Sequence, residues 1–210
     1  MVLNKRSPMA YVVDDDASVC RALKLLLEQN RFRVEVFTRA KEFLAFKKLK
    51  VPSCLVLDVR MPCLGGLALQ KIMTDKQVAI PIVFITSFGT VPMSVRAMKA
   101  GAIDFLSKPF TEEKLLKAIG TAISQNKAQI KRNVEIAAIN RHIHSLSPRE
   151  LEVFHFVAKG MLNKQIASRR GTSIQTIKVH RGRVMRKMQA KTLTDLIRIA
   201  QKAGIATSLN

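Results

Sequence analysis

The sequence lacks the long hydrophobic runs that a membrane-spanning helix requires. Its longest apolar stretches, such as residues 81–85, have only the length of a strand. Residues 1–6 contain no apolar signal-peptide core. We therefore expect a protein without membrane association that stays in the cytoplasm.

Cysteine is scarce and follows no pattern. The three cysteines, Cys20, Cys54 and Cys63, are odd in number and do not have the spacing of a disulfide framework or a metal site. They are typical of a reducing compartment, and we expect small buried thiols that are not metal ligands.

Acidic residues are also few, because 15 Asp and Glu face 36 Lys and Arg, which gives a formal net charge of +21. Residues 126–210 carry 17 basic and 4 acidic side chains, whereas residues 1–125 carry 19 and 11. A basic surface attracts polyanions. Charge alone does not distinguish DNA from RNA, acidic lipid or a solvated face.

Short apolar segments alternate with amphipathic ones through the first part of the chain. We predict strands at residues 10–13, 34–37, 54–57, 81–86 and 103–106, and helices at 18–29, 40–49, 66–74, 91–100 and from about 112. Such alternation is typical of an α/β fold with a five-stranded, doubly wound parallel sheet. In these sheets the carboxyl ends of the strands line the binding crevice.

The second part of the chain reads as helical throughout. Residues 126–144 contain no Gly, Pro or Ser, which predicts a helical linker between a domain at 1–125 and a domain at 145–210. In the latter we expect an all-α unit of four short helices. Ser147, Pro148 and Glu150 form a capping-box pattern. A Gly171 turn between two short helices is the helix-turn-helix pattern.

Polar residues stand at the ends of four predicted strands, namely Asp14 and Asp15, Asp58, Thr86, and Lys108. Because clustered carboxylates repel one another, such a cluster needs a cation, and hard oxygen ligands suit Mg²⁺. A carboxylate can serve as nucleophile toward a phosphoryl group that Mg²⁺ and a lysine neutralise. Each residue alone is an ordinary cap, loop or strand residue, and only the set in this order predicts a site.

The segments 12–16, 57–62, 85–87 and 108–110 make residues 1–125 resemble a response-regulator receiver domain. The resemblance implies that Asp58 accepts phosphate from a histidine kinase. It also implies that Asp15, Asp58 and the backbone carbonyl of Arg60 hold Mg²⁺ (or Mn²⁺), with Asp14 acting through water.

By the same resemblance Lys108 pairs with the phosphoryl group, Thr86 moves toward it, and Phe105 changes rotamer in response. Phe105 replaces the tyrosine common in this family, which bears on the switch. Gly65 stands where many receivers carry an acidic or polar residue, and we expect only a loop effect.

The segments 146–150, 163–167, 176–181 and 185–188 resemble the LuxR-type helix-turn-helix, so nearly the whole chain resembles a response regulator of the FixJ/NarL type. A recognition helix of this kind fits the major groove. The candidate DNA-binding residues are Lys164, Thr176, Lys178, Val179, His180, Arg181 and Arg183. Lys178 and Val179 are implied to meet bases. Arg170 and Thr172 replace apolar residues of the family, which predicts a less tightly packed scaffold helix.

The function implied is a two-component transcription regulator and not an enzyme. Phosphorylation promotes a homodimer that binds double-stranded promoter DNA, with a cognate histidine kinase and RNA polymerase as further partners. Two alternatives stay open: phosphorylation-independent DNA binding with a structural receiver, and a basic RNA-binding signalling protein.

A third alternative is a haloacid-dehalogenase-like phosphatase, because Asp14 and Asp16 have the spacing of its aspartates. The sequence has neither a later acidic pair at a strand end nor a cap domain, so this alternative has less support.

Overall fold

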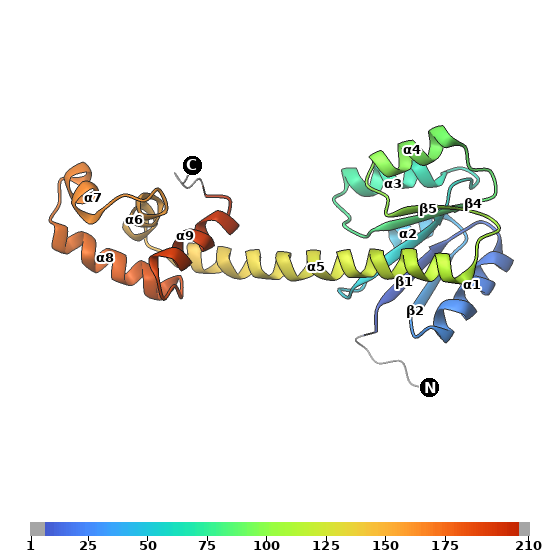
Figure 1. The fold of residues 1–210 in the computed structure, drawn as a ribbon, viewed down its shortest axis with the longest axis horizontal. Coiled ribbons are helices and arrows are strands. Elements are labelled where there is room, and N and C mark those ends of the chain that lie inside the picture. The colour runs from blue at the N-terminus through green and yellow to red at the C-terminus, as the bar shows by residue number, and fades with distance from the viewer. Residues whose placement is uncertain (1–6, 206–210) are drawn as a thin grey trace. The chain divides into compact units, whose positions relative to one another are not determined.

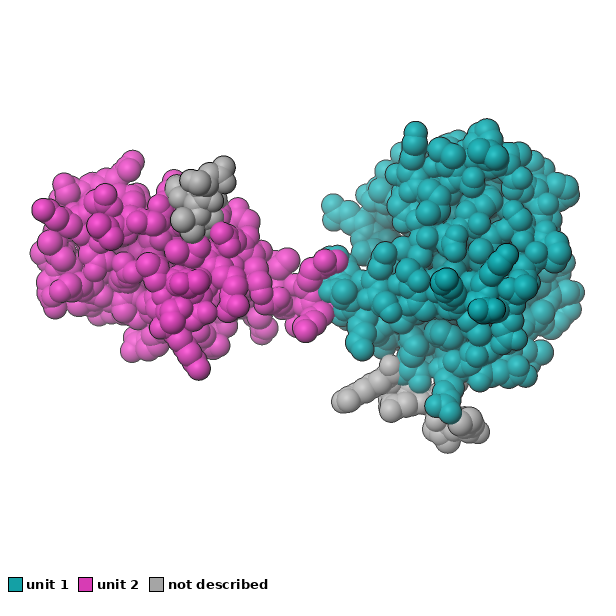
Figure 2. Space-filling model, viewed as in Figure 1, with its two compact units in different colours: residues 1–130 teal, residues 131–210 magenta. Residues whose placement is uncertain are grey.

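The computed structural model describes residues 7–205, and residues 1–6, on which the signal-peptide expectation rests, lie outside that range. The chain forms two compact units, residues 1–130 and 131–210, shown in different colours in Figure 2. Within the described residues, no helix is long and apolar enough to cross a membrane.

The first unit contains a five-stranded, all-parallel sheet in the order β2-β1-β3-β4-β5, which confirms the predicted fold class. Its strands are β1 (Met9–Val13), β2 (Arg33–Phe37), β3 (Ser53–Asp58), β4 (Ile82–Thr86) and β5 (Asp104–Ser107). Its helices are α1 (Ala17–Gln29), α2 (Ala40–Ala45), α3 (Gly66–Asp75), α4 (Val91–Lys99) and the start of α5 (Glu112–His144). Strands β1, β3 and β4 are buried along their whole length, because helices cover both faces of the sheet.

Two apolar clusters lie on opposite faces of this sheet. One contains Leu23 and Leu27 of α1 with Leu115 and Ile119 of α5, and the other packs α2, α3 and α4 against the sheet. Figure 1 shows these helices on either side of the strands. The layers leave the carboxyl ends of the strands open at one edge.

Helix α2 is shorter than predicted, because it ends at Ala45 and not at residue 49. Phe46 turns into an extended conformation, and its ring packs against Phe37 at a centroid distance of 5.2 Å. The Lys48 ammonium donates hydrogen bonds to the carbonyls of Phe43 and Leu44 in the last turn of α2, and the Phe43 carbonyl also accepts one from the Phe46 backbone N–H. Ring packing and this cap together stop the helix, and the apolar periodicity did not show either.

Helix α5 belongs to both units. Asn126, 4% exposed, accepts a hydrogen bond from the Ser53 backbone N–H at 2.9 Å and donates one to the Ala79 carbonyl at 2.8 Å. Ile139 and Ile143 pack in the core of the second unit. The first unit therefore reaches past the predicted boundary at 125, and the second begins before 145.

The second unit adds helices α6 (Pro148–Ala158), α7 (Asn163–Arg170), α8 (Ile174–Lys187) and α9 (Leu193–Lys202). The capping box of Ser147 and Glu150 is present, as predicted. Gly171 ends α7 with a φ of 59°, a left-handed conformation that glycine adopts without strain. Ser173 caps α8 by accepting a hydrogen bond from the Thr176 backbone N–H at 3.0 Å. The tight turn fixes α7 against α8.

The expectation of three buried thiols is wrong for one of them. Cys20 and Cys54 are buried, whereas Cys63 is exposed in the loop between β3 and α3. Cys54 lies in β3, whose residues are all buried, and Cys63 follows Pro62 beyond the end of that strand. A loop position at the sheet edge has no apolar layer to cover it.

Candidate functional site

A pocket of about 290 Å³ opens at the carboxyl edge of the sheet. Its lining comes from the ends of β1, β3, β4 and β5 and from the residues that follow them. It contains Asp14, Asp15, Asp16, Val19, Asp58, Arg60, Thr86, Ser87, Phe88 and Lys108. The fold thus brings together the residues that the sequence predicted as a set, apart from Phe105.

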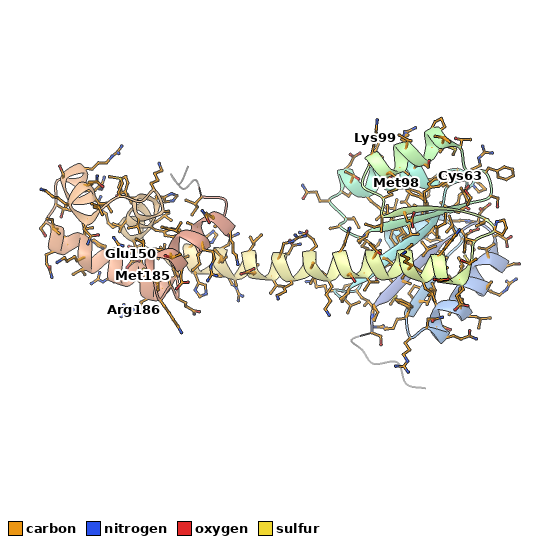
Figure 3. All side chains as sticks on the ribbon, viewed as in Figure 1. Cys63, Met98, Lys99, Glu150, Met185 and Arg186 are labelled. Atoms are coloured by element: carbon orange, nitrogen blue, oxygen red, sulfur yellow. The ribbon has the colours of Figure 1, made fainter. Side chains whose placement is uncertain are left out.

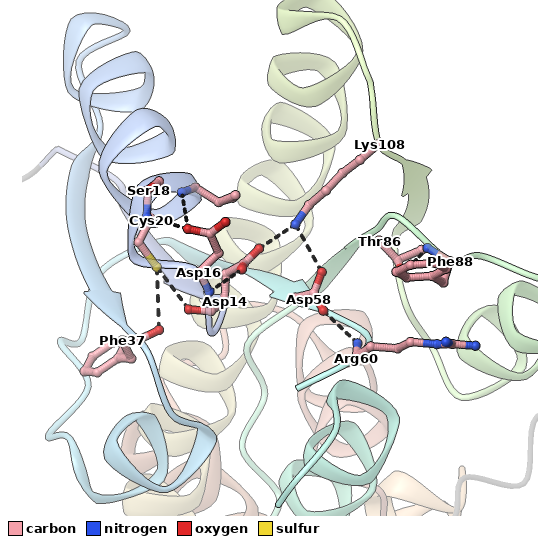
Figure 4. A network of polar contacts seen from close by, with 11 residues as sticks. Asp14, Asp16, Ser18, Cys20, Phe37, Asp58, Arg60, Thr86, Phe88 and Lys108 are labelled. Carbon is pink, nitrogen blue, oxygen red and sulfur yellow. Dashed lines mark hydrogen bonds and ion pairs between the residues drawn. The ribbon is translucent and has the colours of Figure 1, made fainter. Parts of the chain in front are cut away.

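Lys108 joins the two buried carboxylates of this pocket. Its Nζ lies 2.6 Å from Asp14 Oδ2 and 3.2 Å from Asp58 Oδ1 (Figure 4). The second oxygen of Asp58 accepts a hydrogen bond from the Arg60 backbone N–H at 2.7 Å. Asp14 Oδ1 accepts one from the Asp16 backbone N–H at 3.0 Å. Both carboxylates are therefore held in defined orientations around one ammonium group.

Burial dominates the electrostatics of Asp58. It raises the pKa of this carboxyl above its usual value, although the hydrogen bond and charge of Lys108 act in the opposite direction. Burial alone would lower the pKa of Lys108, but its contacts with Asp14 and Asp58 raise it overall. One lysine thus faces several carboxylates, and the pocket retains an excess of negative charge.

The donor set fits a hard divalent cation. Asp14, Asp15 and Asp58 supply carboxylate oxygens, and Asp15 is exposed at the pocket mouth. Within residues 7–205 no three acidic, His or Cys side chains form a ready ligand cluster. Mg²⁺ keeps several waters and needs only one or two protein carboxylates, so the residues present fit this ion.

Two further side chains flank the pocket in a way that sequence reasoning missed. The Arg60 guanidinium lies over the Phe88 ring, 4.9 Å from its centroid, and this contact stabilises both side chains beside Asp58. The buried Thr86 hydroxyl accepts a hydrogen bond from the Phe88 backbone N–H at 3.2 Å. Phe105 is half-buried, with its ring 6.1 Å from that of Phe84. No short sequence pattern joins residues 60 and 88.

Gly66 is the second feature that the sequence did not explain. A Cβ atom at this position would lie 2.3 Å from the Asp58 carbonyl oxygen and 3.1 Å from the Phe84 ring. Only glycine lets α3 begin this close to the end of β3. The one signal in the sequence was a Gly-Gly pair just after the aspartate.

The predicted recognition helix α8 presents a basic face. Lys178, Val179 and Arg183 are exposed, whereas Ile177 and Val184 are buried. Lys164 is exposed in the first turn of α7, and Thr176 in the first turn of α8. The exposed set can reach base edges and phosphates when α8 enters a major groove.

Two of the predicted DNA-binding residues, His180 and Arg181, are half-buried inside the unit. Arg181 Nη1 donates a hydrogen bond to Asn163 Oδ1 at 3.0 Å, which ties α8 to α7. His180 is half-buried, and its Nδ1 atom has no hydrogen-bond partner among the described residues. Sequence spacing did not separate these positions from the exposed ones.

Ion pairs hold the helices of this unit together, and the sequence did not reveal them. Lys187 Nζ lies 2.6 Å from Glu150 Oε2 and 2.9 Å from the Ser145 carbonyl. The hydrogen bonds from Lys187 and from the Ser147 backbone lower the pKa of Glu150 to about 2. Arg170, which stands in place of an apolar residue, pairs with Glu152 at 2.8 Å. Figure 3 places Glu150 beside the end of α8 that carries Met185 and Arg186.

Models of two known protein families match this chain, one in each unit. A family model of the response regulator receiver domain matches residues 10–120. A model of bacterial regulatory proteins of the luxR family matches residues 144–200.

Relatives match over nearly the full length. Nodulation protein W of Bradyrhizobium diazoefficiens is 42% identical over 95% of this chain and 88% of its own length. The transcriptional regulatory protein FixJ of the same species is 42% identical over 93% of this chain and 95% of its own.

Solved structures agree. The response regulator StyR, at 42% identity, has a TM-score of 0.82 over 93% of this chain and 99% of its own. Full-length FixJ from B. japonicum, at 40% identity, has a TM-score of 0.55 over 94% of this chain and 98% of its own. This evidence decides against the dehalogenase-like alternative. The chain belongs to the two-component response regulators that join a receiver domain to a LuxR-type DNA-binding domain and regulate transcription.

Proposed function

We propose that Asp58 is the phosphoacceptor of this regulator and that its phosphorylation promotes dimerisation and sequence-specific binding to promoter DNA. The observation that carries the proposal is the Lys108 bridge between Asp14 and Asp58. A buried carboxylate beside an ammonium group and further oxygen ligands is suited to accept a phosphoryl group. The donor would be a phosphohistidine of a cognate kinase.

In the transfer, an oxygen of the Asp58 carboxylate forms a bond to phosphorus while the bond from phosphorus to the histidine nitrogen breaks. Lys108 neutralises charge on the phosphoryl oxygens. The Thr86 hydroxyl, which now accepts from Phe88 N–H, can donate a hydrogen bond to one of them. Thr86 movement then frees space near Phe105, whose ring can follow.

Asp15, Asp58 and the Arg60 carbonyl are the groups we assign to Mg²⁺ (or Mn²⁺), with Asp14 acting through water. When bound, the ion supplies charge neutralisation on the phosphoryl oxygens. Asp14 keeps Lys108 in place by its 2.6 Å contact, so it orients the lysine whether or not the ion is bound.

A stripe of apolar side chains on α4 supports dimerisation through the face of the fourth and fifth helices. Val91, Val95 and Met98 are 76%, 44% and 45% exposed and recur at helical spacing, and Phe88 just before them is 63% exposed. Figure 3 shows Met98 on α4. Because Phe88 follows Thr86 by two residues, movement of Thr86 reaches this stripe directly.

In the DNA-binding unit we assign base contacts to Lys178, Val179 and Arg183 of α8, and phosphate contacts to Lys164 and Thr176. His180 and Arg181 then position α8 from its inner side. A dimer would present two such helices to half-sites one helical turn apart, with RNA polymerase as a further partner. We assign the exposed turns of α5 near residues 131–137 to the linker.

The test compares wild-type protein with Asp58→Asn by light scattering, with and without Mg²⁺ and beryllofluoride. We expect the mimic to shift wild type from monomer to dimer and to leave Asp58→Asn unchanged. If Asp58→Asn binds its DNA as well as phosphorylated wild type does, the alternative of phosphorylation-independent DNA binding is correct.

A further inference from the structure

The edge of the receiver sheet opposite the pocket, where the strands begin, gathers three segments that are distant in sequence. Asn126 of α5 binds the Ser53 backbone N–H at 2.9 Å and the Ala79 carbonyl at 2.8 Å. The loop that enters β3 and the loop that enters β4 therefore meet at the same side chain of α5. This is also where α5 leaves the sheet.

These segments are strongly basic and contain no acidic side chain. The loop before β3 carries Lys47, Lys48 and Lys50, the loop after α3 begins with Lys76, and Lys127 follows Asn126. The sequence has no Asp or Glu at residues 43–57, 76–103 or 114–134. The nearest acid in sequence, Asp75, already pairs with Lys71 at 2.9 Å.

Two of the lysines from different loops, Lys48 and Lys76, are also close in space. Burial and the charge of Lys76 lower the pKa of Lys48, so these two ammonium groups repel each other across the two loops. Lys48 is fixed by its hydrogen bonds to the carbonyls of Phe43 and Leu44 and lies 4.3 Å from the centre of the Phe43 ring. We call Lys47, Lys48, Lys50 and Lys76 the basal lysine patch.

Among residues 7–205, no carboxylate forms an ion pair with a lysine of the patch. Lys47, Lys50 and Lys76 are exposed. Three other lysines of the receiver, Lys24, Lys71 and Lys108, each pair with a carboxylate. A surface that holds like charges together without counter-charges is complementary to a polyanion.

We propose that the basal lysine patch binds the phosphate backbone of DNA, so that the receiver adds a second, sequence-independent contact to the one made by α8. The inference rests on the proposed DNA-binding function. Once α8 holds a duplex, the patch meets the same polyanion at high effective concentration, because α5 joins the two units covalently. Each phosphate that a lysine neutralises releases counterions.

A duplex fits the patch better than single-stranded RNA does. Proteins that bind single strands combine basic grooves with exposed aromatic rings on which bases stack. Among the described residues, Phe88 is the one aromatic side chain in the exposed class of large hydrophobics, and it lies at the opposite edge of the sheet. The patch therefore offers charge without a stacking platform.

The test uses the full chain with three substitutions, K47Q, K50Q and K76Q, and leaves Lys48 in place because it caps α2. The control carries R21Q, K24Q and K41Q, which remove the same charge from exposed positions on α1 and α2. Binding to a long random-sequence DNA duplex is measured by fluorescence anisotropy over a series of KCl concentrations. Thermal melts of both variants check that they fold.

We expect the patch variant to flatten the slope of log Kd against log[KCl] by about 2–3, since each lost phosphate contact on a duplex contributes about 0.9. The control should keep the wild-type slope. Equal slopes for the two variants overturn the inference. A patch variant that loses binding to phosphatidylserine vesicles or to single-stranded RNA, but keeps the wild-type slope on DNA, also overturns it.

A recognition-helix variant, K178Q with R183Q, separates this inference from the proposed function. If it binds the duplex as wild type does, the proposed DNA-binding surface is wrong. If it weakens binding while the patch variant matches its control, only the patch inference is wrong.

A second measurement does not depend on variants. Wild-type protein is acetylated with and without the duplex and analysed by mass spectrometry. We expect DNA to protect Lys47, Lys50 and Lys76, and to leave Lys24 and Lys41 as reactive as before. If DNA protects the patch lysines no more than it protects Lys24 and Lys41, the inference is wrong.

Discussion

Asp14 and Asp58 are 1% and 6% exposed at the strand ends of the receiver, whereas Lys178, Val179 and Arg183 lie exposed on α8 of the second unit. The first unit thus keeps its reactive groups inside, where burial raises the pKa of Asp58 and the contacts with Asp14 and Asp58 outweigh burial to raise the pKa of Lys108. The second displays its functional groups and pairs the buried Glu150 carboxylate with Lys187, whose side chain is partly exposed. Chemistry requires a controlled local dielectric, whereas recognition of DNA requires a surface that a partner can reach.

The two units also differ in what fixes their geometry. In the receiver, a sheet buried on both faces places the pocket residues at one edge. In the second unit, helix caps and ion pairs orient short helices around a smaller core. We therefore expect the stability of the receiver to be sensitive to steric change near the pocket, and that of the second unit to changes in charge.

The largest expected effect is the complete loss of phosphorylation at the receiver pocket. Asp58→Asn should abolish phosphorylation by acetyl phosphate and Mg²⁺, because the amide is not a nucleophile, as measured on a phosphate-affinity gel. Asp75→Asn is the matched control, since Asp75 is exposed at the end of α3 and pairs with Lys71 outside the pocket. A phosphorylated Asp58→Asn protein would show that another residue accepts the phosphate.

A substitution in the second unit should instead affect DNA binding alone. Arg183→Ala should weaken specific DNA binding by roughly 5–150-fold, which corresponds to a loss of about 1–3 kcal/mol, and should leave phosphorylation unchanged. Lys159→Ala, an exposed lysine at the end of α6, serves as the control. Equal affinities of the two variants in an electrophoretic mobility assay would exclude Arg183 from the interface.

A steric change tests the sensitivity of the receiver. Gly66→Ala should lower its free energy of unfolding by roughly 1–3 kcal/mol, because the new methyl group meets the Asp58 carbonyl oxygen at 2.3 Å. Gly120→Ala in α5, where a Cβ meets no atom within 4 Å, should instead stabilise it by about 0.5–1 kcal/mol. Urea unfolding checks both. Equal effects would mean that the close approach at Gly66 is not limiting.

A change of charge tests the second unit. Glu150→Gln should lower its free energy of unfolding by about 1.5 kcal/mol at neutral pH, since the charged hydrogen bonds with Lys187 and Ser147 are weakened. The pKa of Glu150 is lowered to about 2, so its contribution is complete above the ordinary value of 4.5 and is lost as pH falls toward 2. The difference between variant and wild type should therefore shrink in acid. A constant difference from pH 7 to pH 3 would contradict the assignment.

The smallest effect concerns Arg170. Its pair with Glu152 joins two side chains that are each 33% exposed, so Arg170→Leu should change the free energy of unfolding by no more than about 0.5 kcal/mol. A calorimetric melt measures it. A larger loss would show that this ion pair holds α7 against α6 more strongly than exposed pairs usually do.

Most of the fold followed from local patterns. The strands and helices of the receiver appear in the predicted order, and the capping box at Ser147 starts its helix as expected. The early end of α2 did not follow, because Phe46 packs on Phe37 and Lys48 reaches back to two carbonyls. The extent of the first unit did not follow either, because Asn126 is fixed by residues about 50 to 70 positions earlier in the chain.

The sequence by itself determined the order of strands and helices, the helix caps and the set of polar residues at the strand ends, since each depends on neighbours within a few positions. Only the tertiary structure decided which side chains meet. The Lys108 bridge, the stacking of Arg60 on Phe88, the close approach at Gly66 and the turning of Arg181 toward Asn163 all join residues from different elements. Such contacts depend on the packing distance between elements, and no local periodicity encodes that distance.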